Sequence, residues 1–181
     1  MPRLFIAIDF PASVVEQIQN ICFGIRDARW TPRNQLHLTM RFIGECHNGL
    51  FENIAAELDK ISLRGFTVGA QGVGYFPLRG NPRIVWVGVK PDDALSELRT
   101  SIDQVLSRLE VQEEKKKFHP HVTVARLRDN TPPEWIIPFL ADNNLFKTEE
   151  FEIKEFHLFS SILQKQGAIH QIEETYQLLE S

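Results

Sequence analysis

Two short segments of the sequence each place a histidine two residues before a threonine. Residues 37–40 read His-Leu-Thr-Met and residues 121–124 read His-Val-Thr-Val. Because imidazole titrates near pH ~6.5, one histidine can be neutral and accept a proton while the other is protonated and donates one. The threonine hydroxyls can hydrogen-bond the non-bridging oxygens of a phosphate and stabilise the charge that develops there. These four side chains match the needs of opening a 2′,3′-cyclic phosphate with water, and no metal ion is needed if the imidazolium, the threonines and an arginine supply the electrostatics.

The residues around each motif alternate in the way that a β-strand requires. His37 and Thr39 alternate with apolar residues, and so do His121 and Thr123. Because side chains of a strand point to opposite faces in turn, each strand should have one apolar side that packs under a helix. The other side carries the histidine and the threonine and must meet water or a ligand. If the two strands confront each other, all four polar side chains surround one small site.

Two arginines follow the motifs at different steps of the alternation. Strict alternation places Arg41 on the same side of its strand as His37, where it is a candidate phosphate ligand. The same rule places Arg126 on the face opposite His121, so Arg126 reaches the site only through a bulge or at the strand end. We include both arginines as candidate substrate-binding residues.

The elements that must position the motifs occur in a repeated order. Each half is expected to contain strand, helix, strand, helix and strand, and the third element carries the histidine motif. The expected elements are 4–10, 11–29, 36–43, 50–61 and 66–75 in the first half, and 84–89, 92–109, 119–126, 132–140, 151–163 and 168–178 in the second. This pattern favours an α+β fold with two pseudo-symmetric lobes, with mainly antiparallel sheets facing a central cleft and helices outside. We expect residues 1–181 to form a single bilobal domain.

Composition limits the classes of function. The 181 residues are 43% apolar and carry a net charge of −4, which argues against a basic platform for long nucleic-acid duplexes. A small basic cleft for one phosphate or one RNA terminus remains compatible with that charge. No apolar run approaches the ~20 residues that cross a bilayer. With only Cys22 and Cys46 there is no disulfide framework, although one bridge between them is open, so a reducing cytoplasm is expected.

Other histidines invite different interpretations. His119 and His121 lie on alternate residues and could be half of a metal site, but no cysteine cluster or set of carboxylates accompanies them, so no metal or other cofactor is predicted. His47, His157 and His170 lack motif partners and are expected to be structural or solvated. A single His-x-Thr can also be a hydrogen-bonded pair on a solvated sheet face. The matching positions of the two copies are what favour a shared site.

Several segments together resemble the two-histidine phosphoesterases. Within that group the resemblance is to the RNA 2′,3′-cyclic phosphodiesterases historically called 2′-5′ RNA ligases. The segments that carry it are 3–8, 36–44, 76–77, 118–126, 158–163 and 167–168. The two histidine segments are specific when they occur together, and the resemblance spans nearly the whole chain.

The resemblance implies a hydrolase that converts a terminal 2′,3′-cyclic phosphate of RNA to a 2′-phosphate without a metal, and some relatives also join RNA ends through a 2′-5′ linkage. It implies that His37 protonates the leaving 3′ oxygen, that His121 activates water, and that Thr39 and Thr123 hold the phosphate. The chain departs from the family at one position, because His170 stands where many relatives have a tyrosine.

Two rival functions are compatible with the same residues. One is a nucleotide-binding module that keeps the fold without the chemistry. The other is a cyclic phosphodiesterase for a small molecule such as ADP-ribose 1″,2″-cyclic phosphate. The expected partners are RNA termini or cyclic nucleotides as substrate, with no membrane, and a monomer is the simplest expectation for a closed two-lobe unit.

Overall fold

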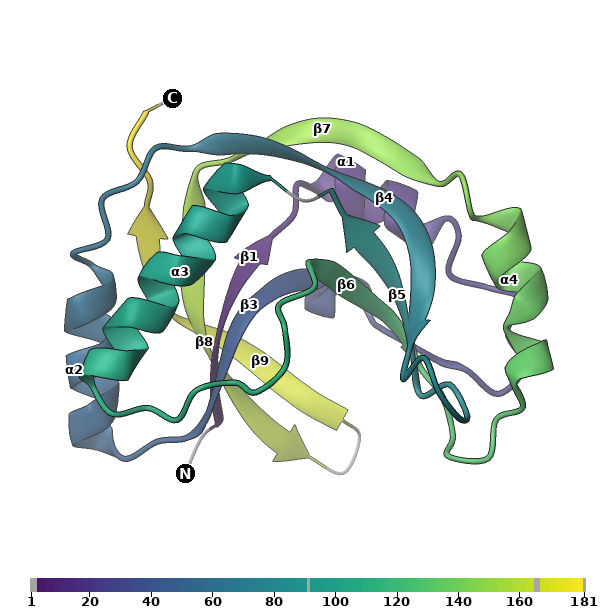
Figure 1. Cartoon of the computed structure of the whole chain (residues 1–181), viewed down its shortest axis with the longest axis horizontal. Helices are drawn as coiled ribbons and strands as arrows, with labels where there is room; N and C mark the ends of the chain where they lie inside the picture. Colours follow the sequence, from purple (N-terminus) through teal and green to yellow (C-terminus); the bar gives the residue numbers. More distant parts are fainter. Residues whose placement is uncertain (1–2, 91, 165–166, 181) are drawn as a thin grey trace.

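The computed structural model describes residues 3–90, 92–164 and 167–180 (Figure 1). Its elements follow the repeated order of strands and helices expected from the sequence, and the α+β class is confirmed. In chain order they are β1 (Arg3–Asp9), α1 (Ala12–Gln19), β2 (Arg29–Trp30), the 3-10 helix η1 (Arg33–Gln35), β3 (His37–Glu45), α2 (Asn48–Leu58), β4 (Phe66–Phe76), β5 (Ile84–Val89), α3 (Asp93–Arg108), β6 (His121–Arg126), the 3-10 helix η2 (Pro133–Trp135), α4 (Ile137–Asp142), β7 (Lys147–Ile153), β8 (Glu155–Gln164) and β9 (Gly167–Gln177).

The strands form a sheet whose order is symmetric about its centre. The order is β7-β4-β5-β6-β3-β1-β8-β9, with β2 beside β6, and the pairings between these strands are antiparallel. The motif strands β3 and β6 meet at the centre through the pair Leu38 and Val122. Outward from this pair, β6-β5-β4-β7 mirrors β3-β1-β8-β9, which confirms the two pseudo-symmetric halves. The halves exchange strands, since β4 pairs with β5 of the second half and β8 pairs with β1 of the first.

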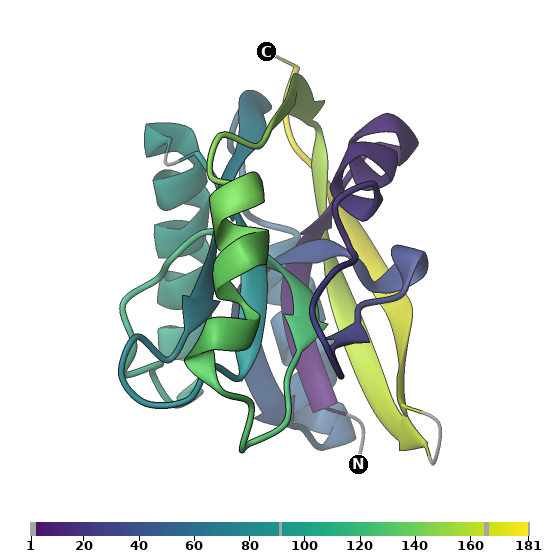
Figure 2. The same cartoon turned by 90° about the vertical axis from the view of Figure 1, so that its right-hand side faces the viewer.

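The helices cover the strands from outside. α3 packs against α2 and β3, and α1 packs against β7. Figure 2 shows α3 and α1 on opposite sides of the strands. α3 begins where Asp92 accepts hydrogen bonds from the backbone N–H groups of Ala94 and Leu95, as an N-cap residue does. Its apolar residues recur at helical spacing and are buried: Leu95, Leu98, Ile102, Val105 and Leu106.

Some element boundaries differ from the sequence predictions. α1 ends at Gln19 rather than near residue 29, because the chain turns through Gly24, whose φ is +86°, before β2. The helix expected at 132–140 is divided into η2 and α4. The strand expected at 151–163 is also divided, because residues 151–153 belong to β7 and Lys154 separates β7 from β8. We also predict a turn at Gln166 and Gly167, between the strands expected at 151–163 and 168–178, and Gln166 lies outside the described residues.

Two features of the described chain bear on its surroundings. Both cysteines are free thiols, with Cys46 buried and Cys22 partly buried. Among the described residues no helix is long and apolar enough to span a membrane.

Candidate active site

The central pair of the sheet brings the two motifs together. Leu38 of β3 pairs with Val122 of β6, and both side chains are fully buried. Residues directly opposite in an antiparallel pair share a face, and their sequence neighbours point to the other face. His37 and Thr39 therefore project from the same face as His121 and Thr123, with His37 diagonally across from His121. We call this side of the sheet the motif face.

A bulge follows the first motif and redirects Arg41. In the pairing of β3 with β1, Met40 has no partner between Thr39 and Arg41. A bulge interrupts strict alternation, and both Met40 and Arg41 are buried on the side of the helices. The Arg41 side chain is 3% exposed, and its guanidinium forms ion pairs of 3.2 Å with Asp103 and with Glu114. The prediction that Arg41 lies on the histidine side of its strand was therefore wrong.

A matching bulge follows the second motif and brings Arg126 to the motif face. In the pairing of β6 with β5, Val124 has no partner after Thr123. Arg126 is exposed, and its charge acts on the rings of both His37 and His170. The bulge that the sequence argument required for Arg126 is thus present, and it occurs at the same step after the threonine as in the first motif.

Each motif histidine is oriented by a backbone carbonyl two residues earlier. Nδ1 of His121 lies 2.6 Å from the carbonyl oxygen of His119. The ring of His37 likewise donates a hydrogen bond to the backbone carbonyl of Gln35. A carbonyl oxygen only accepts, so Nδ1 of His121 carries the proton and Nε2 is left for proton transfer.

The ring of His37 lies in an aromatic environment. Its centroid is 5.1 Å from that of Phe5, 5.9 Å from that of Phe159 and 5.3 Å from that of His170. Burial, followed by the charges of His170 and Arg126, lowers the pKa of His37 to about 4 against the opposing effect of the Gln35 carbonyl. His37 is therefore neutral at pH 7 in the free protein.

His121 is held by a second aromatic group. The Phe76 ring lies 5.2 Å from the His121 ring at 80°, and the Trp86 ring lies at 6.2 Å. Burial lowers the pKa of His121, the hydrogen bond to the His119 carbonyl raises it, and the charge of His119 lowers it. The Trp86 indole packs directly against Gly74, where an added Cβ atom would lie 2.2 Å from the ring.

Comparisons with known proteins agree with this geometry. The model of the 2′-5′ RNA ligase superfamily matches residues 10–163. The chain belongs to this superfamily. The chain is 32% identical over 171 residues to the RNA 2′,3′-cyclic phosphodiesterase of Archaeoglobus fulgidus, covering 93% of this chain and 96% of the relative. It is 31% identical over 180 residues to the protein of the same name from Thermotoga maritima, covering 94% and 92%.

Solved structures of Escherichia coli LigT have the same fold as this chain. The chain superposes on Escherichia coli LigT in its apo form with a TM-score of 0.78 and 26% identity, covering 98% of each chain. It superposes on E. coli LigT complexed with 3′-AMP with a TM-score of 0.76 and 26% identity, again covering 98% of each chain.

His170 lies at the candidate site, although the sequence analysis did not include it among the site residues. It was expected to be structural or solvated, yet β9 brings its ring to the motif face beside His37 and 4.9 Å from the ring of Phe5. This placement depends on the pairing of β9 with β8, which local alternation does not indicate. The metal interpretation of His119 and His121 gains no support, since no group of three or more potential ligands occurs among the described residues.

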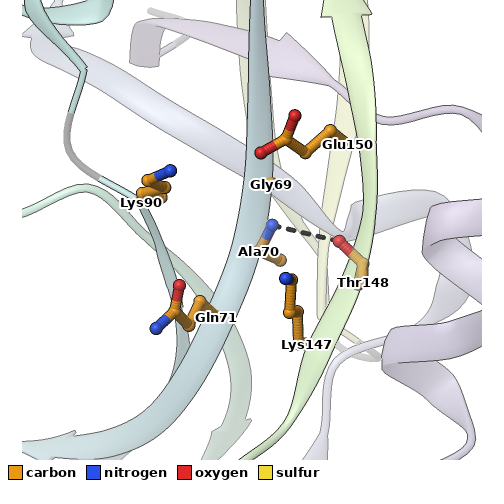
Figure 3. A pocket seen from close by; sticks show the side chains of 7 residues that line it. All are labelled: Gly69, Ala70, Gln71, Lys90, Lys147, Thr148 and Glu150. Carbon is orange, nitrogen blue, oxygen red and sulfur yellow. Dashed lines mark hydrogen bonds between the residues drawn. The ribbon is translucent and has the colours of Figure 1, made fainter.

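A hollow between β4 and β7 lies apart from the superfamily motifs (Figure 3). Its volume is about 40 Å³, little more than the ~30 Å³ of one water molecule. Thr148 in its wall accepts a hydrogen bond from the backbone N–H of Ala70 and donates one to the carbonyl of Glu149. With the threonine satisfied in this way, the hollow is a packing feature of the sheet.

Proposed function

We propose that this chain hydrolyses the 2′,3′-cyclic phosphate at the 3′ end of RNA to a 2′-phosphate, with His37 and His121 as the acid–base pair. The observation that supports it most is the pairing of Leu38 with Val122, which puts both motifs on one sheet face. Membership of the 2′-5′ RNA ligase superfamily and the printed names of the curated relatives support the same reaction.

The reaction needs one proton removed and one supplied. A water oxygen attacks phosphorus, the bond from phosphorus to the 3′ oxygen breaks, and the 3′ oxygen leaves as a hydroxyl. One imidazole takes the proton from the water and the other gives a proton to the 3′ oxygen. Thr39 and Thr123 donate hydroxyl hydrogen bonds to the non-bridging oxygens and hold the phosphate between the two rings.

The surroundings of the two rings divide these roles. His37 is the more deeply buried imidazole and stands near two further basic groups, so it is the one kept neutral. Burial also lowers the pKa of His121, but less of its ring is buried, and its hydrogen bond from Nδ1 to the His119 carbonyl favours the protonated form. We therefore assign water activation to His37 and protonation of the 3′ oxygen to His121, the reverse of the order that the family resemblance implied.

The same geometry allows a second outcome. If the 5′-hydroxyl of another RNA takes the place of water, its oxygen attacks phosphorus, the 3′ oxygen leaves, and a 2′-5′ linkage forms. The imidazolium and Arg126 supply the positive charge for either reaction, so the proposal requires no metal ion. We propose further that the chain works as a cytoplasmic monomer, which fits its free thiols.

An RNA oligomer with a 2′,3′-cyclic phosphate end tests the proposal. The wild type should add one water and leave a 2′-phosphate, with undiminished activity in EDTA, and His37→Ala and His121→Ala should each lose nearly all turnover. His47→Asn is a matched control, because asparagine preserves the helix cap that His47 gives Leu50 while removing an imidazole outside the motif strands.

Each failure points to a different error. Near wild-type turnover by either alanine variant would show that the paired mechanism is wrong. Loss of activity in EDTA that added metal restores would contradict metal independence. Nucleotide binding without hydrolysis would favour a binding module, and preferred turnover of ADP-ribose 1″,2″-cyclic phosphate would favour a small-molecule substrate.

A further inference from the structure

The sheet itself joins the two motif strands weakly. β3 pairs with β1 along residues 37–45 and β6 pairs with β5 along residues 121–126, whereas β3 and β6 share a single register pair, Leu38 and Val122, among the described residues. Each motif is therefore held firmly within its own half of the sheet. A displacement of about 1 Å between catalytic groups can cost ~100-fold in rate, so the two motif histidines need a further constraint across the centre.

Arg99 of α3 contacts both motif segments from the side of the sheet that is opposite the motif face. Its Nη1 atom donates a hydrogen bond to the carbonyl of Met40, the residue that the bulge after the first motif threonine leaves without a partner in β1. Its Nη2 atom lies 2.9 Å from a carboxylate oxygen of Glu114, and its guanidinium lies 4.9 Å from the centre of the Phe118 ring. One side chain thus connects the end of the first motif to the segment that leads into the second.

Arg41 and two carboxylates complete a cluster around Arg99. Arg41 donates a 2.6 Å hydrogen bond to the carbonyl of Gln112 and forms a 3.2 Å ion pair with Glu114, so β3 holds the same loop. The carboxylate of Asp103 lies between the two guanidinium groups, 2.6 Å from Nε of Arg99 and 3.2 Å from Nε of Arg41. Two cations therefore face two carboxylates, and the arginine side chains are only 3% and 11% exposed. A balanced and largely buried network of this kind is suited to fixing one geometry.

The loop that the cluster holds leads directly to the group that orients His121. Residues 109–120 connect α3 to β6 (Figure 1). His119 directly follows Phe118 in this loop, and the carbonyl of His119 accepts the 2.6 Å hydrogen bond from Nδ1 of His121. A shift of the loop at Phe118 therefore displaces this carbonyl and turns the His121 ring relative to the first motif histidine.

We propose that Arg99 is a positioning residue, which fixes the relative placement of the two catalytic imidazoles from the side of the sheet that α3 covers. The inference rests on the proposed function and deepens it, because it names a residue outside the site on which the rate depends. Arg99 acts through the segments that it holds and does not lie on the motif face. Its loss should therefore slow the chemical step while the groups that bind substrate stay in place.

Arg99→Met tests the inference, because methionine keeps an unbranched side chain against Phe118 and removes the hydrogen bonds and the charge. On an RNA oligomer with a 2′,3′-cyclic phosphate end, kcat should fall about tenfold or more while KM stays within about twofold of wild type. Ile102→Val is the matched control, since Ile102 is a fully buried residue of the same helix and its truncation weakens the core without touching the loop. This variant should be less stable than wild type, with kcat within about twofold of it.

The ring proton of His121 provides a second measurement that needs no turnover. In NMR spectra of the folded proteins, the Nδ1 proton that bonds the His119 carbonyl should exchange slowly with solvent in wild type and in Ile102→Val, and rapidly in Arg99→Met. The ring proton of His37 that bonds the Gln35 carbonyl should exchange slowly in all three proteins.

The two measurements separate a failure of the inference from a failure of the proposed function. An unchanged kcat in Arg99→Met, a rise in KM alone, or an equal loss of kcat in Ile102→Val would overturn the positioning role. If the wild type hydrolyses no cyclic phosphate, the proposed function fails, while rapid exchange of the His121 proton in Arg99→Met alone would still uphold the positioning of this ring.

Discussion

Arg41 and Arg126 lie on opposite faces of one sheet, although each closely follows a motif threonine. Arg41 is two residues after Thr39 and is buried against α3 and the loop that follows it, whereas Arg126 is three residues after Thr123 and is exposed on the motif face. The bulge after each threonine makes this difference, because it buries the two residues that follow and returns the third to the motif face. Phe42 is the third residue in the first motif, so the two strands offer an aromatic ring and a cation at equivalent positions.

Replacing Arg41 should impair stability rather than substrate binding. Arg41→Gln leaves Asp103 and Glu114 facing Arg99 alone and removes the hydrogen bond to the carbonyl of Gln112. The free energy of unfolding should fall by about 2 kcal/mol, less than for a fully buried pair because both carboxylates are partly exposed. Urea unfolding measures this, and Arg126→Gln, with no ion pair to lose, should stay within about 0.5 kcal/mol of wild type. If Arg41→Gln kept wild-type stability and raised KM, Arg41 would bind substrate, and its assignment as a structural residue would be wrong.

The sequence correctly predicted which face of each motif strand is buried. It did not predict the features that depend on which strands pair with each other. The period of two around Leu38 and Val122 correctly indicated a buried side and a histidine side for each strand. The bulge that turns Arg41 inward arises from pairing with β1, and the arrival of His170 beside His37 depends on β8 and β9 lying next to β1. Such pairings join residues remote in the chain, so local alternation carries no record of them.

Protonation of His37 should couple folding to pH. The pKa of His37 is about 4 in the folded protein and near the ordinary ~6.5 when unfolded, so between these values the unfolded chain binds more protons. Stability should be intact above pH ~6.5 and fall as the pH is lowered, by about 2 kcal/mol at pH 5 from this residue. Urea unfolding at pH 7.5 and pH 5 should show a smaller loss for His37→Gln. Equal losses in both proteins would mean that His37 is not kept neutral by its surroundings.

A methyl group at Gly74 should disturb the support of His121. The added Cβ atom would lie 2.2 Å from the Trp86 ring, which must move away from its contact with Phe76. We expect Gly74→Ala to lower the free energy of unfolding by about 1–3 kcal/mol, as overpacking does, and to reduce kcat. Gly49→Ala in α2 is the control, because the nearest atom is 3.8 Å from its Cβ and alanine favours a helix. Unchanged stability and kcat for Gly74→Ala would show that Trp86 does not hold the site.

The division of roles between His37 and His121 can be read from a leaving group that needs no proton. In a 2′,3′-cyclic phosphorothiolate the 3′ oxygen is replaced by sulfur, which departs as a thiolate, so a general acid contributes little to its release. We propose His121 as the acid because His37 is the more deeply buried ring and its pKa is lowered to about 4. His121→Ala should therefore recover at least about tenfold of its lost rate on the sulfur substrate, while His37→Ala, which lacks the base that activates water, should remain as impaired as on the oxygen substrate. If His37→Ala instead recovered its rate on the sulfur substrate, His37 would be the acid and His121 the base. A bound phosphate would then raise the pKa of His37 far enough for it to be protonated.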